Sequence, residues 1–319
     1  MKCFVTGGAG FIGSNLVDRL VEAGHGVTVY DNLSTGSARF LKQHEGRPGF
    51  AFVKADLLDA DKLNSAMAGH EAVFHLAANA DVRFGVNYPR RDLEQNTVGT
   101  FHVLEAARLN AVRQFMFSST SAIYGETAVI PTPEDAPFPV QTSLYGASKL
   151  AGEGMMQAYA EAFGIQVFVF RFVSLLGERY GHGHIFDFCR SLRKDPTLLH
   201  VLGNGAQKKS YIYVQDCIEA ILLAMEKATA KVNVFNLGTD EYSDVNNSIR
   251  IICERLGVKP KITYGGGDRG WVGDSPFIFL DCARIKRLGW KARTSINEGI
   301  GRTVDYLVEN PWLLEDRER

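Results

Sequence analysis

Near its amino terminus the chain reads Lys2-Cys3-Phe4-Val5-Thr6, followed at once by Gly7-Gly8-Ala9-Gly10-Phe11-Ile12-Gly13. The first run is typical of a buried strand, and helical periodicity follows the glycines. Gly7 and Gly10 let the backbone turn sharply and approach a pyrophosphate, and Gly13 lets the helix pack closely on the strand. The N–H groups of the helix start attract an anion. A glycine-rich turn without a ligand is the alternative interpretation, since a lone motif of this kind has false positives.

Outward from this stretch, short apolar runs alternate with longer segments of helical periodicity. We expect strands at residues 2–6, 27–30, 51–54, 72–75, 114–118 and 166–170, and helices at residues 12–24, 60–68, 90–110 and 143–163. This alternation predicts an α/β fold with a doubly wound parallel sheet of the Rossmann type. The pattern then loosens, so we expect a dinucleotide-binding domain at 1–172 and a smaller mixed α/β substrate lobe at 173–319. Some later segments are expected to return to the first domain.

The composition excludes several classes of function. The 319 residues are 45% hydrophobic and carry a net charge of −1, so the surface has no broad basic field for nucleic acid. The sequence lacks a long apolar run and a leader, and we expect a soluble protein that does not bind membranes. Its five cysteines are scattered, without a Cys-x-x-Cys pair, which indicates reduced thiols in the cytoplasm.

A carboxylate marks the end of the second expected strand. Asp31 at this place accepts hydrogen bonds from a ribose diol and repels a 2′-phosphate, so the sequence favours NAD over NADP. A helix-capping role for Asp31 is the alternative. Asp56, after the third strand, is expected to reach the adenine or to cap a helix or turn. The small residues of His75-Leu76-Ala77-Ala78 leave room for a dinucleotide over the sheet edge.

Tyr145 and Lys149 lie four residues apart, on one face of an expected helix. The ammonium group stabilises a tyrosinate and thereby lowers the phenol pKa toward that of a general base. Thr120 follows the fifth strand, where its hydroxyl is expected to bridge a substrate alcohol and Tyr145. A Tyr-x-x-x-Lys pair on a solvated helix face is the alternative, but the glycine turn and the polar strand end favour catalysis.

At these residues the chain resembles the extended short-chain dehydrogenase/reductases, specifically the NAD-dependent nucleotide-sugar epimerase/dehydratase family. The resemblance covers nearly the whole chain. In the first domain it rests on residues 6–13, Asp31-Asn32-Leu33, His75-Leu76-Ala77-Ala78, Asn96, Ser118-Ser119-Thr120 before Tyr124-Gly125, and Tyr145 with Lys149. In the second lobe it rests on Arg171-Phe172, Gly203-Asn204-Gly205-Ala206-Gln207, Tyr213-Val214-Gln215-Asp216, and Gly273-Asp274 followed by Pro276.

The resemblance implies NAD as the cofactor and Thr120, Tyr145 and Lys149 as catalytic residues. The implied NAD contacts are Gly7, Gly10, Phe11, Ile12, Gly13, Asp31, Asn32, Asp56, Leu57, Leu76, Ala77, Ala78, Asn96, Ser118, Tyr145 and Lys149. The substrate is expected to be a nucleoside-diphosphate sugar, linked to UDP or GDP, held by Thr120, Ser121, Ser174, His184, Lys209, Arg269 and Asp274. A homodimer with the helices near 92–110 and 145–163 paired across a two-fold axis is also implied.

The residues after Thr120 narrow the reaction. The family's 4,6-dehydratases carry an Asp-Glu pair there, whereas this chain has Ser121 and Ala122 and so lacks the acid and base for eliminating water. The resemblance therefore implies C4 epimerisation of the sugar through a transient 4-keto intermediate. A C4 dehydrogenase that releases a 4-keto product, a 4,6-dehydratase and a non-catalytic NAD-binding protein are the alternatives.

Several residues depart from the family pattern. Ser174 replaces an asparagine, Lys209-Ser210 replaces Arg-Asp, and the spacing after Arg269 is longer, so the diphosphate site is expected to differ in shape. His182 and His184 have no matching Cys or carboxylate pattern, which favours loop or substrate contacts over a metal. Trp271 is either a stacking platform or a packing residue.

Overall fold

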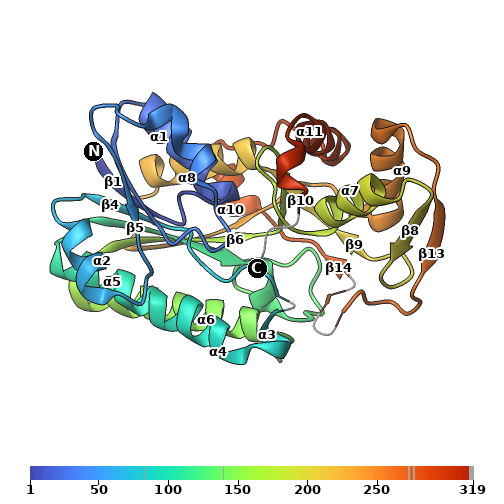
Figure 1. Ribbon diagram of the computed structural model, residues 1–319. Coiled ribbons are helices and arrows are strands. Elements are labelled where there is room, and N and C mark those ends of the chain that lie inside the picture. Colours follow the sequence, from blue (N-terminus) through green and yellow to red (C-terminus); the bar gives the residue numbers. More distant parts are fainter. Residues whose placement is uncertain (83, 139, 272–273, 276, 316–319) are drawn as a thin grey trace.

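The computed structural model describes residues 1–82, 84–138, 140–271, 274–275 and 277–315. At its centre lies a seven-stranded parallel sheet in the order β11-β6-β5-β4-β1-β2-β3 (Figure 1). The strands are β1 (Lys2–Thr6), β2 (Gly26–Asp31), β3 (Phe50–Lys54), β4 (Ala72–His75), β5 (Gln114–Thr120), β6 (Gln166–Phe172) and β11 (Val232–Leu237). The expected doubly wound α/β fold is confirmed.

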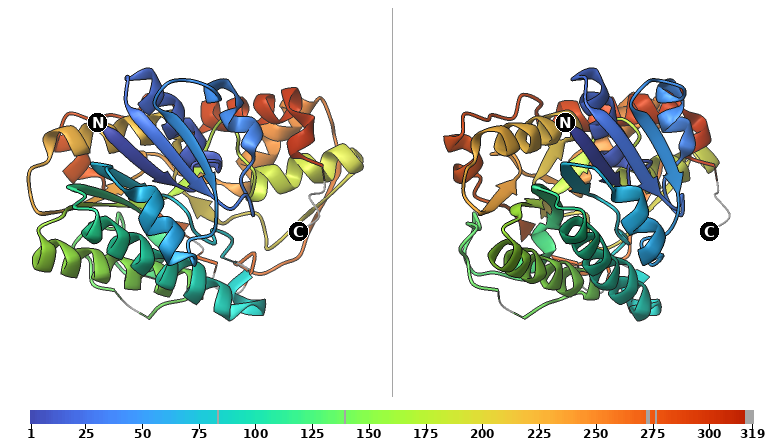
Figure 2. Two further views of the ribbon diagram at one scale, coloured as in Figure 1. Left: turned by 60° about the vertical axis from the view of Figure 1, so that its left-hand side comes forward. Right: turned by 90° about the vertical axis from the view of Figure 1, so that its left-hand side faces the viewer.

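Both faces of the sheet are covered by helices, which explains why its strands are continuously apolar. Figure 2 shows the helical layers on either side. One layer contains α1 (Phe11–Glu22), α8 (Val214–Lys227) and α10 (Ala283–Arg287). The other contains α2 (Ala60–Met67), α5 (Gly99–Leu109) and α6 (Leu144–Phe163), with the short α3 (Phe84–Asn87) and α4 (Pro89–Arg91) beside it.

The alternation of side chains along each strand builds two cores. Val5 of β1 joins the core under α1 and α8, whereas its neighbour Phe4 joins the core under α5 and α6. Phe168 and Val169 of β6 divide between the two cores in the same way. The strand period of two therefore fixes which residues meet each helical layer.

Two features of this part were not among the expected strands and helices. The seventh strand, β11, comes from the later half of the chain and pairs in parallel with β6, so a later segment returns to the first domain as expected. The single helix expected at 90–110 is instead α4, a π-helical segment η2 (Asp92–Val98) and α5. At the end of η2, the Gly99 N–H donates to the carbonyl of Glu94, five residues earlier. Such π-segments often mark functional sites.

A smaller lobe has its own core, formed by apolar residues of three helices such as Ile185, Ile252 and Val304. The helices are α7 (His184–Lys194), α9 (Val245–Leu256) and α11 (Ile296–Glu309). Short strands pair as β10-β7, β12-β9-β14 and β13-β8. Their bounds are β7 (Ser174–Leu176), β8 (Leu198–Val201), β9 (Lys208–Lys209), β10 (Tyr211–Tyr213), β12 (Ser243–Asp244), β13 (Lys261–Tyr264) and β14 (Phe277–Ile278). The 3₁₀ turns are η1 (Ala38–His44), η3 (Ser121–Tyr124) and η4 (Pro311–Leu313).

Candidate active site

The glycine turn lies at the carboxyl end of β1, where the strand order reverses between β4 and β2. Gly7 has a φ of +69°, and a Cβ there would lie 2.6 Å from the backbone nitrogen of Ala77. A Cβ at Gly13 would lie 2.2 Å from the carbonyl oxygen of Gly7. Among the described residues, no side chain caps Gly10 at the start of α1. This open helix start, in a cradle that admits only glycine, fits the pyrophosphate of a dinucleotide.

Asp31 ends β2 beside this turn and is 8% exposed. Its carboxylate accepts hydrogen bonds from the backbone N–H groups of Ala9, at 2.9 Å, and Leu33, at 2.8 Å. Burial raises the pKa of Asp31, and these two hydrogen bonds oppose the rise. A carboxylate has about four acceptor positions, so two remain for a ribose diol. Asp31 thus lies against the glycine turn with free acceptor positions, and it does not cap α1.

Asp56 follows β3 and connects with the loop after β2. It accepts from Asn32 Nδ2 at 2.8 Å and from the backbone of Leu58 at 3.0 Å. Burial opposes ionisation of Asp56, but hydrogen bonds from Leu58, Asn32 and Gln95 outweigh it and lower its pKa. The N-cap of α2 is Asp59, so the helix-cap role considered for Asp56 is wrong. Leu57 is buried beside it.

The end of β4 is tied to β1 through a buried imidazole. One ring nitrogen of His75 lies 2.7 Å from Thr6 Oγ1 and the other lies 2.9 Å from Thr100 Oγ1. Burial lowers the pKa of His75 to about 3, and the charge of Lys149 acts in the same direction. The Ala77 N–H donates to Thr6 Oγ1 at 3.3 Å. The segment Leu76-Ala77-Ala78 therefore lies against the glycine turn at the carboxyl edge of the sheet.

Thr120, Tyr145 and Lys149 come together at the neighbouring strand end. Thr120 is the last residue of β5, and α6 starts with Ser143 as its N-cap, which accepts from the Gly146 N–H at 3.0 Å. Burial raises the pKa of Tyr145 to about 12, a hydrogen bond with Thr120 lowers it, and the charge of Asp92 raises it further. This hydrogen bond joins two of the three predicted catalytic residues across 25 positions (145 minus 120) of sequence.

Lys149 is 2% exposed, and its Nζ donates to the Ser118 carbonyl at 2.8 Å. Burial lowers the pKa of Lys149 to about 7, whereas the charges of Asp92 and Glu153 raise it. The Ser118 hydroxyl donates to the carbonyl of His75 at 3.0 Å, which joins β5 to β4 at this edge. The ammonium group is thus held beneath the strand end, one helical turn from Tyr145.

Sequence reasoning missed the charged groups that support this arrangement. Glu153 and Arg171 form a buried ion pair at 2.7 Å, and the Ser119 hydroxyl donates to Glu153. Asp92 is buried in η2 and accepts from Asn96 Nδ2 at 3.2 Å. The available signal was helical spacing, since Glu153 stands four residues after Lys149 and Asp92 four before Asn96.

The predicted substrate residues of the second lobe form a cluster. Lys209 Nζ donates to Asp274 at 2.7 Å and lies 4.7 Å from the ring centroid of Trp271. Arg269 pairs with Glu126 and donates to the Asp274 carbonyl at 3.1 Å. The cluster thus presents two cations, each already neutralised by a carboxylate. Gly273 and Pro276 lie outside the described residues.

The other predicted substrate residues are more scattered. Ser174 is exposed on β7, and Ser121 is buried in η3 next to Thr120. His184 starts α7, and its Nε2 is buried without a hydrogen-bond partner in the described part of the chain. Burial lowers the pKa of His184 to about 3, with a contribution from the charge of Lys209. His182 is exposed in the preceding loop, and its ring stacks on the ring of Tyr180 with the two ring centroids 6.0 Å apart.

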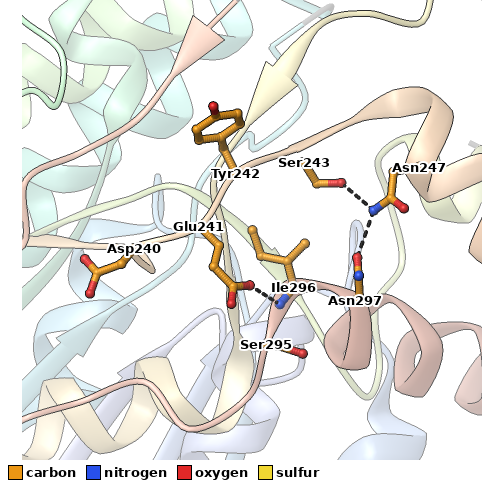
Figure 3. A pocket seen from close by; sticks show the side chains of 8 residues that line it. All are labelled: Asp240, Glu241, Tyr242, Ser243, Asn247, Ser295, Ile296 and Asn297. Carbon is orange, nitrogen blue, oxygen red and sulfur yellow. Dashed lines mark hydrogen bonds between the residues drawn. The ribbon is translucent and has the colours of Figure 1, made fainter.

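A separate pocket of about 430 Å³ lies where α9 and α11 begin (Figure 3). It is lined by Asp240, Glu241, Tyr242, Ser243, Asn247, Ser295, Ile296 and Asn297, none of which is a predicted site residue. Glu241 accepts from the Ile296 N–H at 3.0 Å, and Asn247 donates to Ser243 and Asn297. These groups satisfy one another, so the pocket is not the candidate active site.

Comparisons with known proteins show the family of this chain. The model of the NAD dependent epimerase/dehydratase family matches residues 3–238. UDP-glucose 4-epimerase of Mycolicibacterium smegmatis is 34% identical over 314 residues, which cover 96% of this chain and 98% of that protein.

Solved structures give the same result. A crystal structure of UDP-galactose 4-epimerase is 39% identical, covers 98% of this chain and 100% of its own, and has a TM-score of 0.87. UDP-glucose 4-epimerase of Thermotoga maritima, solved with UDP-glucose, is 35% identical with the same coverages and a TM-score of 0.88. Within the described residues, no helix combines the length and apolar character needed to cross a membrane. The chain belongs to the NAD dependent epimerase/dehydratase family and is an NAD-dependent enzyme.

Proposed function

We propose that this protein epimerises a nucleoside-diphosphate sugar, and in the first place a UDP-hexose, at C4 through a transient 4-keto intermediate. The observation that carries the proposal is the meeting of Thr120, Tyr145 and Lys149 at a strand end beside the glycine turn. The similar proteins named above are UDP-glucose and UDP-galactose 4-epimerases, and one of them was solved with UDP-glucose.

The proposed NAD site follows the carboxyl edge of the sheet. Its pyrophosphate is assigned to the open helix start at Gly10-Phe11-Ile12-Gly13, and its ribose to Asp31 with Asn32. Asp56, Leu57, Leu76, Ala77, Ala78, Asn96, Ser118, Tyr145 and Lys149 complete the proposed contacts. When bound, NAD supplies a hydride acceptor that later returns the hydride to the same carbon.

Tyr145 moves the proton in the proposed reaction. Its phenolate takes the proton of the C4 hydroxyl, which the Thr120 hydroxyl orients, while the C4–H bond breaks and C4 becomes a carbonyl carbon. Lys149 stabilises the phenolate during this step. After the keto sugar has turned its opposite face, Tyr145 returns the proton to the C4 oxygen as the C4–H bond forms again. The proton and hydride return to the sugar, so the reaction needs no external oxidant.

The diphosphate is assigned to Lys209 and Arg269. Lys209 pairs with Asp274 and Arg269 pairs with Glu126, and these contacts with carboxylate oxygens support the assignment. Lys209 offers a point charge where arginine would make a two-pronged contact. Ser121, Ser174, His184 and Asp274 are proposed to contact the remaining parts of the nucleotide sugar. Residues 1–172 are proposed to hold NAD together with Thr120 and Ser121, and residues 173–319 to supply the other sugar contacts.

The decisive experiment incubates the purified protein with a panel of UDP-, GDP- and CDP-sugars. Interconversion of the two C4 epimers without added cofactor is the expected result. Formation of NADH with release of a keto product would contradict epimerisation and support the C4 dehydrogenase. Loss of water from the sugar would support the dehydratase instead. Absence of turnover with every sugar would support a non-catalytic NAD-binding protein.

Tyr145→Phe is the matched variant, because it removes only the ionisable oxygen. We expect the variant to bind NAD and sugar nearly as before and to lose about 10²- to 10⁴-fold in kcat. Binding is measured by calorimetry and turnover by separating the two epimers. A rate close to that of the unmodified protein contradicts the role given to the phenol.

We further propose a homodimer formed by η2, α5 and α6. Leu93, Phe101, Leu109 and Phe163 are exposed large apolar side chains on these elements. Apolar residues grouped on neighbouring helices are typical of a surface that binds a partner.

All five cysteines are free thiols, which supports a reducing compartment, and we propose the cytoplasm.

A further inference from the structure

Four charged side chains are buried in and around the proposed catalytic site. Asp92, Lys149, Glu153 and Arg171 are each at most 3% exposed. Glu153 and Arg171 pair directly through several hydrogen bonds, and the Ser119 hydroxyl also donates to Glu153. Burying an ion without a counter-charge is costly. Because Arg171 already neutralises Glu153, the remaining buried cation and anion are Lys149 and Asp92.

The Asp92 carboxylate is held at one oxygen and bare at the other. Its Oδ1 accepts from Asn79 Nδ2 at 2.8 Å and from Asn96 Nδ2 at 3.2 Å. Its Oδ2 is buried and has no hydrogen-bond partner within the described residues. A Cβ at Gly85 would lie 2.3 Å from this Oδ2 and 3.3 Å from Leu144 Cβ. The bare oxygen therefore lies between α3 and the first turn of α6, which carries Tyr145.

A chain of hydrogen bonds joins Asp92 to that turn. Asn96 Nδ2 donates to Ser148 Oγ at 3.0 Å, and Ser148 Oγ donates to the Tyr145 carbonyl at 2.8 Å. Asn96 Oδ1 accepts from the Asn79 N–H at 2.7 Å, which fixes the orientation of the Asn96 amide. The π-helical turn η2 places Asp92 and Asn96 on this buried side together.

We propose that Asp92 is a positioning residue for the reaction proposed above: its buried carboxylate is the counter-charge that retains the Lys149 ammonium beside Tyr145, and it holds Asn96 against α6. This inference rests on the proposed function, since a catalytic role for Tyr145 and Lys149 gives it its meaning. Asp92 is not among the residues assigned above to contact with NAD or the sugar.

The charges around Lys149 and Asp92 determine the direction in which Asp92 shifts the pKa values of Lys149 and Tyr145. Lys149 faces Asp92, Glu153 and His75, and Tyr145 faces Asp92, while Asp92 also faces Asp81. Glu153 is engaged by Arg171, and His75 is neutral near pH 7. The negative charge of Asp92 raises the pKa of Lys149, which burial lowers to about 7, and also raises the pKa of Tyr145. Removing the charge of Asp92 therefore lowers the pKa values of both Tyr145 and Lys149, which titrate as a coupled pair.

The test is the pH profile of Asp92→Asn, which keeps the shape of the side chain and removes its charge. With NAD-loaded enzyme and saturating UDP-glucose, we expect both limbs of the kcat profile to move to lower pH by about one unit. Glu94→Gln is the control, because Glu94 is in the same turn but only half-buried and paired with Arg90, and its profile should coincide with that of the unmodified enzyme. Limbs that stay in place, even with a lower kcat at every pH, overturn the proposal.

A second measurement does not require turnover. Ultraviolet titration of the NAD-loaded protein follows tyrosinate formation, and Tyr145→Phe identifies the part that belongs to this phenol. We expect Asp92→Asn to lower the midpoint of that part by about one unit. An unchanged midpoint contradicts the inference, even if the unmodified protein turns over no sugar and the proposed function fails. Asp92→Ser removes the same charge and replaces Asp92→Asn if the amide variant does not fold.

Discussion

His75 makes the stability of the protein depend on pH, and replacing it by glutamine tests this dependence. Its imidazole is fully buried between Thr6 and Thr100, which engage both ring nitrogens. Burial lowers its pKa from 6.5 to about 3 in the folded protein. The folded state therefore holds the neutral ring, whereas the unfolded chain takes up a proton below pH 6.5.

The sign and the size of the pH effect on the free energy of unfolding follow from this shift in the pKa of His75. The group contributes its full stability above pH 6.5, and the contribution is lost as the pH falls from 6.5 toward 3. At about 1.4 kcal/mol per pKa unit, the loss approaches about 5 kcal/mol below pH 3 and is already about 2 kcal/mol at pH 5. His184 has a similarly lowered pKa and adds its own loss in the unmodified protein. Only the difference between the protein and its His75→Gln variant isolates His75.

The assay is equilibrium unfolding in urea at pH 8 and pH 5. Glutamine keeps a donor and an acceptor for the two threonines but takes up no proton in this range. We expect the free energy of unfolding to fall between the two pH values by about 2 kcal/mol less in His75→Gln than in the unmodified protein. His200→Gln, which removes an exposed imidazole, is the control. Equal falls in the protein and in His75→Gln would refute the argument, whatever the absolute stability of the variant.

Three further predictions concern the cofactor site and the proposed dimer. Asp31→Ala is expected to reduce the preference for NAD over NADP about tenfold, about 1.4 kcal/mol, because no carboxylate then repels a 2′-phosphate; titration with both cofactors measures this, and an unchanged preference contradicts it. Gly13→Ala is expected to lower the free energy of unfolding by about 1–3 kcal/mol and to weaken NAD binding, because its Cβ would overlap the Gly7 carbonyl. Gly154→Ala, with open space around its Cβ, is the control and should leave NAD binding, measured by calorimetry, unchanged. Phe101→Glu is expected to shift the protein to monomers in analytical ultracentrifugation, whereas Val308→Glu, exposed on α11, should not; a dimer in both variants excludes the proposed interface.

Local patterns were sufficient for the framework of the first domain. Each of the six expected strands is present, and its ends lie within two residues of the expected ones. The glycine turn was predictable because its constraints are mostly local: Gly7 has a positive φ, and a Cβ at Gly10 or Gly13 would approach the Gly7 carbonyl oxygen. Tyr145 and Lys149 share a helix face through their spacing alone. Their meeting with Thr120 was an expectation that depended on the parallel sheet, whose strand ends all point to one edge.

The sequence by itself thus determined the alternation of strands and helices, the phosphate-binding turn and the polar residues at the strand ends, because these depend on neighbours a few positions apart. Only the tertiary structure decided which charges are buried together. Glu153 meets Arg171 of β6, Asp92 lies beneath α6, and Lys209 pairs with Asp274. Packing brings these groups together across long stretches of chain and removes them from water, and the same burial shifts their pKa values. A linear pattern contains neither the separation of two such charges nor the amount of water left between them.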